Sequence, residues 1–468
     1  MKRSWLAAIA LAAPVFLVPA SNPDLFWHLS AGKWIVENFS IPRADFLSFT
    51  RSGAPWHDFE WLAQVLYYGV YAGFGFAGLW LLKVALLAAA GALFVSAIPR
   101  ERRPSWLVAW AACMFVRADI RPELFSLLFF TLLTTRTLSP AATLATFALW
   151  SNLHAGFLFG LPLLLTRPRL LAAALAGSLC NPYGWGPYLV ALQHADVAYI
   201  TEWRPSNPLN PYHWPFFALL ALYLYGRKLA DWASLYALAA LRHARLALFF
   251  EARALPELAR RFAPPAWAAL PYAAWLMFLA AGLSWSAWFD HRSVPLRAAR
   301  FIEEAPRLKL YNEWEWGGYL AWRIPGYKVF WDGRYLFHDL LNEAAEAARS
   351  AENWQAFLDK HGLQGALLEN RRQLFPSVRV YKDGSSKPLL RPWYLTYMPR
   401  ERWALVYFDD KTLFFVRRDA VPKAWLKAHE YKWLRPHDEE AFADARRRGE
   451  IPDAELQAEA ARHVLETP

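Results

Sequence analysis

Hydrophobic runs separated by short polar breaks fill the first 288 residues, and this pattern predicts a helical region embedded in a membrane. Several runs are shorter than the roughly 20 residues of an ideal crossing. A count of about 11 crossings would place the N-terminus inside and the C-terminus outside. The runs interpreted as crossings are 5–20, 79–98, 106–116, 124–133, 142–150, 157–165, 170–179, 214–225, 229–241, 246–255 and 267–288.

The polar breaks alternate in character along the chain. One set is Arg and Lys with few other polar residues, at 100–103, 136, 167–169, 227–228 and 260–261. The other set mixes acids, amides, His and Arg, at 22–24, 117–121, 152–154, 181–184 and 242–245. Positive charge remains on the cytoplasmic side of a membrane. We therefore expect a multi-pass protein of a bacterial inner membrane, with the mixed set facing outward.

The N-terminal run is interpreted as an uncleaved first helix, although 18–20 also resembles a signal-peptide cleavage site. An outer loop at 21–75 follows, with amphipathic helices expected at 22–38 and 56–71. The membrane domain is thus predicted to cover 1–288.

The pattern changes after about residue 289. Apolar runs shorten to strand length at 308–311, 328–331, 365–368, 378–381, 403–408 and 413–416, with helical patterns at 340–349 and 354–361. Strands that alternate with helices predict an α/β domain. We assign it to 289–436, on the periplasmic side, and expect 437–468 to be a charged, solvated helical tail.

Composition agrees with a membrane protein. The chain is 56% hydrophobic and 19% charged, whereas soluble domains carry about 25% charged residues. The net charge of +11 resides largely in the predicted inner loops, so it favours lipid head groups or lipid phosphates and not nucleic acid. Cys113 and Cys180 lie in apolar runs without a pairing pattern, and buried thiols are the simplest interpretation.

The segment 22–28 is the first candidate for catalysis. Asn22 suits a helix N-cap and Pro23 the first helical position. Asp24 would then lie in the first turn, with His28 one turn later on the same face. A carboxylate beside an imidazole could deprotonate a hydroxyl group or hold a divalent metal. The alternative is a charge at the start of a helix and an interfacial histidine.

Further acids in the same loop could add a second carboxylate or metal ligands. They are Asp45, Asp58 and Glu60, and simple loop charges are the alternative interpretation.

Four arginines at predicted outer helix ends are candidates to bind a phosphate. Ionisable groups in such places are costly unless they are paired or used, and guanidinium groups suit phosphate. Pairing with Asp119, Glu123 or Glu251 is the alternative. The arginines are Arg117, Arg121, Arg242 and Arg245, and further polar candidates for substrate binding are Asn152, His154, His243 and the turn 181–184.

Two motifs near the start of the α/β region, 311–320 and 330–334, are dense in Gly, acids and aromatics. They fit either sugar binding or close packing in a core. The chain contains no Walker loop, dinucleotide fingerprint, HExxH or GxSxG motif.

Taken in order, these motifs resemble bacterial polytopic proteins related to GT-C glycosyltransferases. The resemblance runs through 23–28, 41–48, 56–62, 150–154, 181–184, 242–245, 312–319 and 332–334. It implies a polyprenyl-phosphate sugar donor, an acidic catalytic residue in the first outer loop and direct displacement at the anomeric carbon. Relatives often have Asp-Pro-Asp in the first motif, whereas this chain has Asn22, so a paired-carboxylate or metal site is in doubt.

The resulting prediction is a GT-C-like multi-pass membrane glycosyltransferase. Asp24 would be the general base, assisted by His28, and the acceptor would be a glycan, a lipid or a protein. The alternatives are a non-catalytic scaffold of cell-envelope glycan assembly, which Asn22 favours, and a transporter of lipid or polysaccharide.

Overall fold

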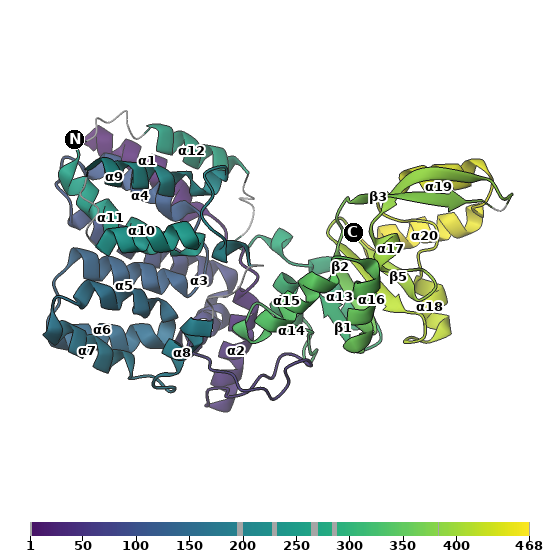
Figure 1. The fold of residues 1–468 in the computed structure, drawn as a ribbon, viewed down its shortest axis with the longest axis horizontal. Helices are drawn as coiled ribbons and strands as arrows, with labels where there is room; N and C mark the ends of the chain where they lie inside the picture. The colour runs from purple at the N-terminus through teal and green to yellow at the C-terminus, as the bar shows by residue number, and fades with distance from the viewer. Residues whose placement is uncertain are drawn as a thin grey trace. The chain divides into compact units, whose positions relative to one another are not determined.

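The computed structural model describes residues 2–193, 200–226, 232–263, 270–282, 288–381 and 383–467. The chain forms two compact units (Figure 1). The first contains 1–44 and 55–290, and the second contains 45–54 and 291–468. The second unit thus begins two residues after the predicted boundary and also takes ten residues from the predicted outer loop.

The regular secondary structure of the first unit, within the described residues, is helical apart from isolated bridges at Ala20–Phe289 and Ala44–Pro55. Its α-helices are α1 (Lys2–Leu17), α2 (Leu25–Asn38), α3 (Trp61–Ser96), α4 (Arg103–Phe115), α5 (Glu123–Thr135), α6 (Pro140–Leu153), α7 (Pro168–Ser178), α8 (Gly186–Gln193), α9 (Trp214–Gly226), α10 (Trp232–Arg242), α11 (Ala247–Arg261) and α12 (Leu270–Ala281). Shorter 3₁₀ segments include η1 (Ala155–Leu164), η3 (Thr201–Trp203) and η5 (Ala244–Leu246). Parts of the predicted runs 229–241 and 267–288 lie outside the described residues.

The prediction of about 11 membrane crossings is wrong. Among the described residues one helix, α3, combines the length and the apolar composition that a crossing requires. Helices α4 and α5 have 13 residues each, which is about 20 Å at 1.5 Å per residue, against about 30 Å of hydrocarbon. Multi-pass placement in a bacterial inner membrane, with a periplasmic C-terminal unit, is contradicted by the same finding.

Polar caps and glycines fix how these short helices begin and pack. The Ser139 hydroxyl accepts a hydrogen bond from the Ala142 N–H at 3.2 Å and caps α6. Helix α3 kinks at Gly75, where φ is 60°. Helices α2 and α3 pack closely because Gly32 has no side chain: a Cβ there would lie 2.1 Å from the Gln64 carbonyl oxygen. The spacing of these two helices is therefore set by backbone contact.

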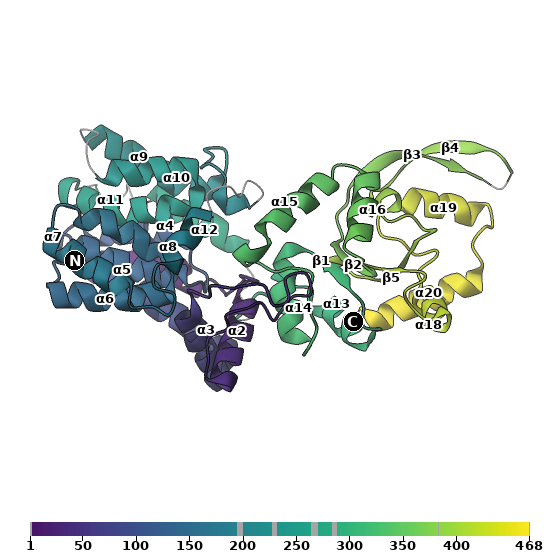
Figure 2. The same ribbon diagram turned by 60° about the horizontal axis from the view of Figure 1, so that its bottom comes forward.

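The second unit combines a mixed sheet with helices. Its strands are β1 (Leu310–Asn312), β2 (Gly365–Glu369), β3 (Leu374–Val380), β4 (Ser386–Pro392), β5 (Trp403–Phe408) and β6 (Thr412–Arg417). Its α-helices are α13 (Leu296–Glu304), α14 (Gly317–Arg323), α15 (His338–Ala347), α16 (Ala351–Lys360), α17 (Tyr394–Tyr397), α18 (Lys423–His429), α19 (Glu439–Arg447) and α20 (Asp453–Glu466). Four strands form one sheet in the order β1-β2-β6-β5, parallel between β1 and β2 and antiparallel elsewhere. Strands β3 and β4 form a separate antiparallel ribbon (Figure 2).

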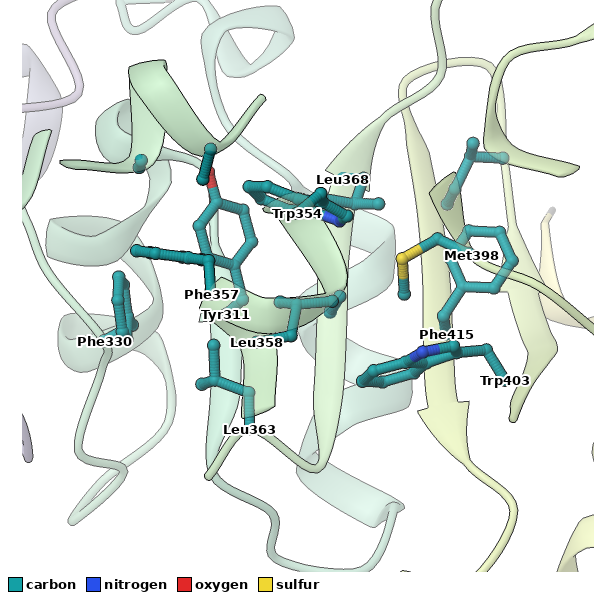
Figure 3. Packing of buried hydrophobic residues seen from close by; sticks show 14 of the residues in the cluster. Tyr311, Phe330, Trp354, Phe357, Leu358, Leu363, Leu368, Met398, Trp403 and Phe415 are labelled. Carbon is teal, nitrogen blue, oxygen red and sulfur yellow. The ribbon is translucent and has the colours of Figure 1, made fainter. Parts of the chain in front are cut away.

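Alternate residues of the sheet face two different sets of helices. On one face, Phe415 of β6 and Tyr311 of β1 belong to the same aromatic core as Trp354 and Phe357 of α16 (Figure 3). On the other face, Phe414 contacts Phe301 of α13 with ring centroids 6.0 Å apart. The sheet is thus covered by helices on both faces.

The two motifs at 311–320 and 330–334 are part of the packed core of this unit. Asn312 accepts a hydrogen bond from the Phe330 N–H at 3.1 Å, and the Trp331 indole donates to the Asn312 carbonyl at 2.6 Å. A Cβ at Gly317 would lie 1.8 Å from the Trp331 carbonyl oxygen. Close packing, the second of the two interpretations, accounts for this density of Gly and aromatics.

The charged C-terminal segment is docked onto the second unit and is not a freely solvated tail. Tyr381 donates to Asp444 of α19 at 2.6 Å. The Glu459 carboxylate of α20, which is buried, accepts from the N–H groups of residues 432, 433 and 434 at 2.9–3.1 Å. These contacts satisfy backbone donors that burial would otherwise leave unpaired.

Candidate functional site

The first candidate motif is anchored at the start of α2. The Asn22 side-chain oxygen accepts from the Asp24 N–H at 2.7 Å. The sequence predicted Asn22 as the N-cap and Asp24 in the first turn, whereas α2 begins at Leu25 and Asp24 itself is at the N-cap position. Asp119 holds the residue before Asn22, because its carboxylate accepts from the Ser21 N–H at 3.0 Å and from the Ser21 hydroxyl at 2.7 Å. Two side-chain acceptors therefore fix the segment that leads into Asp24.

Asp24 belongs to a charged cluster in which acidic and basic side chains alternate. Its Oδ2 lies 4.0 Å from Nη2 of Arg121, and its Oδ1 accepts from the Trp27 indole at 3.3 Å. Arg121 also pairs with Glu202 of η3, and Glu202 lies 3.7 Å from Arg245 of η5. The side chains of the two arginines are 28% and 30% exposed, so this charged cluster is mostly buried and partly accessible to solvent.

Glu60 lies between two imidazoles at the N-terminal end of α3. Its Oε2 is 4.0 Å from Nε2 of His28, and its Oε1 is 3.8 Å from Nε2 of His154. Its side chain is 15% exposed, and those of the two histidines are 4% and 12% exposed. The structure thus brings His28 to Glu60, although the sequence had paired it with Asp24.

Burial raises the pKa values of the Asp24 and Glu60 carboxyl groups to different levels. It raises the pKa of Asp24 to about 6, against the opposing charge of Arg121. It raises the pKa of Glu60 to about 8, partly offset by Arg245 and reinforced by Asp58 and Asp24. At neutral pH, Asp24 is ionised and Glu60 is mostly protonated.

The histidines and Glu202 complete the charge distribution. Burial lowers the pKa of His28 well below its usual range, and it lowers that of His154 to about 3, with Arg245 adding to the effect. Both imidazoles are therefore neutral. Burial opposes ionisation of Glu202, but Arg121 and Arg245 outweigh it and lower its pKa. Its carboxylate neutralises part of the positive charge of the two arginines.

Two of the four predicted phosphate-binding arginines lie outside this cluster. Arg117 donates to the buried Glu251 at 3.0 Å, which is the ion pairing considered as an alternative. Arg242 is exposed at the end of α10. Its neighbour His243 donates from Nδ1 to the Trp203 carbonyl at 2.7 Å, which holds η3 against the segment before η5.

Asn152 and Asp58 have supporting contacts around Glu60. Asn152 accepts from the Trp61 indole at 2.8 Å and donates to the Cys180 carbonyl at 2.8 Å. Asp58 accepts from the Gln64 amide at 2.6 Å. Asn152 was predicted to bind substrate and Asp58 to take part in catalysis, and these contacts hold both side chains beside the start of α3.

Three residues of the site had no candidate role in the sequence. Glu202 lies in a short polar segment without a recognisable motif. Asp119 had been considered only as a partner for arginine. Ser126 is buried in α5, where its hydroxyl lies 2.6 Å from Nδ1 of His154. A serine within an apolar helix carries almost no sequence signal for such a contact.

Within the described residues, no group of three or more His, Cys, Asp or Glu side chains is arranged to hold a metal ion. Comparison with protein-family models and with curated proteins finds no match to this chain.

Proposed function

We propose that this protein is a glycosyltransferase that moves a sugar from a phosphate-linked donor to an acceptor hydroxyl, with Asp24 as the general base. The observation that carries the proposal is the 4.0 Å contact between Asp24 and Arg121. It places a carboxylate able to take a proton beside a cation able to bind a phosphate. The resemblance to GT-C enzymes further implies that the donor phosphate carries a polyprenyl chain.

The reaction is a single displacement. The acceptor oxygen forms a bond to the anomeric carbon while its proton passes to the Asp24 carboxylate. The bond between the anomeric carbon and the phosphate oxygen breaks, and its electron pair remains on the phosphate. Arg121 and Arg245 offset the charge that develops there, a kind of stabilisation worth about 3 kcal/mol for each donor.

The acid strength of Asp24 suits this role. A base works best when its pKa lies near the working pH, since it must be ionised and yet accept a proton readily. Asp24, with a pKa raised by burial to about 6, is ionised at neutral pH and more basic than an ordinary aspartate. Glu60, with a pKa near 8, is less suitable because most of it already carries a proton.

Asn22 had favoured a non-catalytic scaffold. Its side-chain oxygen caps the Asp24 N–H at 2.7 Å, and an amide oxygen does this as well as a carboxylate. The amide at this position therefore has a structural explanation that does not require loss of chemistry.

The test uses the purified full-length protein with short-chain polyprenyl phosphates that carry a radiolabelled sugar, and a host-cell extract as the source of acceptor. Label should move to the acceptor as polyprenyl phosphate is released. Asp24→Asn should slow transfer by about 100-fold or more and still bind farnesyl phosphate. Asp410→Asn, at a carboxylate that is 85% exposed, is the matched control and should transfer at the native rate.

If the Asp24→Asn variant transferred sugar at the native rate, Asp24 would not be the general base. Absence of transfer by the native protein from every donor in the panel would contradict the proposed activity.

A further inference from the structure

The Glu60 carboxyl group has a histidine nitrogen near each of its two oxygen atoms. Oε1 is 3.8 Å from Nε2 of His154, and Oε2 is 4.0 Å from Nε2 of His28. Both separations exceed a hydrogen bond. One oxygen atom, however, can bridge two polar atoms that far apart with two hydrogen bonds of about 2.8 Å each. The arrangement repeats on the two oxygens of a single carboxyl group.

We propose that Glu60, His28 and His154 form a subsite for two neighbouring hydroxyl groups of a sugar ring. One hydroxyl would bridge Glu60 and His154, and the adjacent hydroxyl would bridge Glu60 and His28. The assignment of this ligand to a transfer reaction rests on the proposed function, whereas the ligand class follows from the geometry of the three side chains.

The Gly156 N–H, which can only donate, fixes the direction of the hydrogen bonds at His154. The Gly156 N–H donates to Nδ1 at 3.1 Å, so Nδ1 is an acceptor. The Trp150 indole, which can only donate, gives a hydrogen bond to the Ser126 hydroxyl at 2.7 Å. Ser126 in turn directs its own hydrogen to Nδ1 of His154 at 2.6 Å. In the neutral imidazole the proton must then lie on Nε2, where it points toward Glu60.

The close approach of Ser126, His154 and residue 156 depends on the absence of a side chain at Gly156. A Cβ at Gly156 would lie 2.2 Å from the Ser126 hydroxyl oxygen and 2.8 Å from Nδ1 of His154. Glycine is therefore needed for the three groups to approach. Ser126 is a positioning residue, because it acts on a ligand only through the tautomer of His154.

His28 is the most buried of the three side chains. Its side chain is 4% exposed, and its Nδ1 is buried without a hydrogen-bond partner among the described residues. The proposed hydroxyl reaches the other ring nitrogen, Nε2, which lies 4.0 Å from Oε2 of Glu60. A hydrogen bond at that atom gives this buried ring one polar partner.

The charge state favours hydroxyl groups over ions. Both imidazoles are neutral, and Glu60 is mostly protonated at neutral pH because burial raises its pKa. The carboxyl group then offers one donor and one acceptor, which matches a pair of hydroxyls. The positive charge that a phosphate needs lies instead on Arg121 and Arg245.

The experiment uses full-length protein labelled with ¹⁵N in the histidine rings. The probes are the methyl glycosides of glucose, mannose and galactose, with cyclohexanol as a control that lacks adjacent hydroxyls. We expect at least one glycoside to shift the ring signals of both His28 and His154 in a saturable way, and cyclohexanol to shift neither. The signals are assigned from their loss in His28→Gln and His154→Gln.

Variants separate binding from folding. Glu60→Ala should weaken glycoside binding by about tenfold or more, whereas Glu60→Gln, which keeps a donor and an acceptor, should remain within about threefold. Ser126→Ala should populate the other His154 tautomer, seen in the ¹⁵N signals of its ring, and weaken binding by about threefold to tenfold. Ser178→Ala removes another buried hydroxyl, which bonds to the Leu175 carbonyl at 2.9 Å, and should change neither measurement.

The subsite is overturned if glycosides shift neither histidine, or if Glu60→Ala binds them as well as the native protein. These outcomes differ from failure of the proposed function. Transfer that depends on Asp24, without glycoside binding at Glu60, would leave the activity standing and remove the subsite. Glycoside binding without transfer from any phosphate-linked donor would leave the subsite standing and contradict the proposed activity.

Discussion

Nη2 of Arg334 donates to Oδ1 of Asp45 at 2.6 Å, although the two residues are 289 positions apart in the chain. The same guanidinium donates to both oxygens of Asp332, at 2.7 and 2.8 Å. The side chains of all three residues are at most 1% exposed. This ion triad holds segment 45–54 in the second unit, together with the bridge between Ser48 and Val329.

Removal of the guanidinium should destabilise the second unit. Arg334→Ala leaves two buried carboxylates without their cation, which costs about 3–5 kcal/mol in the free energy of unfolding. Hydrogen exchange of the amides of β2 and β6, measured by mass spectrometry, should accelerate accordingly. Arg349→Ala breaks an exposed pair with Glu346 and should cost less than about 1 kcal/mol. Equal exchange in the two variants would mean that the triad does not stabilise this unit.

Transfer should depend on pH through two groups. Asp24 must be ionised to take a proton, so the rate should rise as pH increases through about 6. Glu60 must be protonated to donate a hydrogen bond to substrate, so the rate should fall as pH increases through about 8. The profile of kcat/KM should therefore be bell-shaped. In Glu60→Gln the alkaline limb should disappear while the acidic limb remains, and an unchanged alkaline limb would assign it to another group.

Arg121 should influence both the base and the donor. Its charge lowers the pKa of Asp24, so Arg121→Gln should move the acidic limb of the profile to higher pH. Farnesyl phosphate should also bind about tenfold more weakly, through loss of a charge-assisted hydrogen bond. Arg167→Gln, at an exposed position before α7, is the control. Equal effects at the two positions would mean that Arg121 does not contact the phosphate.

Ionisation of Glu60 should weaken the fold at alkaline pH. Its folded pKa of about 8 exceeds the ordinary value of 4.5, so the folded state binds the proton more tightly than the unfolded chain. The associated stability is complete below about pH 4.5 and is lost as pH rises toward 8. Glu60→Gln removes this dependence and should be more stable than the native protein at pH 9, by on the order of a few kcal/mol. Urea denaturation at pH 5 and pH 9 measures the difference, and a native protein equally stable at both would contradict it.

The sequence predicted local structure in the second unit better than arrangement in the first. Strand 403–408 is confirmed as β5, and three of its six residues are aromatic, a type that favours strands. The apolar runs of the first unit predicted crossings, since composition alone does not show whether a helix is long enough to span a bilayer. The helices are short: α6 covers the predicted run 142–150 but has 14 residues and ends at Leu153, where His154 caps the following 3₁₀ segment.

For the site, motif order located Asp24, His28, Glu60 and His154 but not their partners. Local spacing placed His28 on the face of Asp24, whereas packing of α2 against α3 directs it to Glu60. Glu202 and Ser126 enter only through tertiary contacts, with sequence separations of 81 from Arg121 and 28 from His154. A local sequence pattern does not predict contacts between residues that are so far apart in the chain.

Gly32 and Gln64 each lie one helical turn beyond the pair His28 and Glu60, and they are where α2 and α3 touch. The spacing of the backbones that carry His28 and Glu60 is therefore set by main-chain atoms, whereas the gap itself is bounded by side chains. A larger residue at position 32 would force α2 away from α3 and separate His28 from Glu60. Substitution of Gly32 should accordingly change ligand affinity at Glu60, although Gly32 lies one helical turn away from that pair.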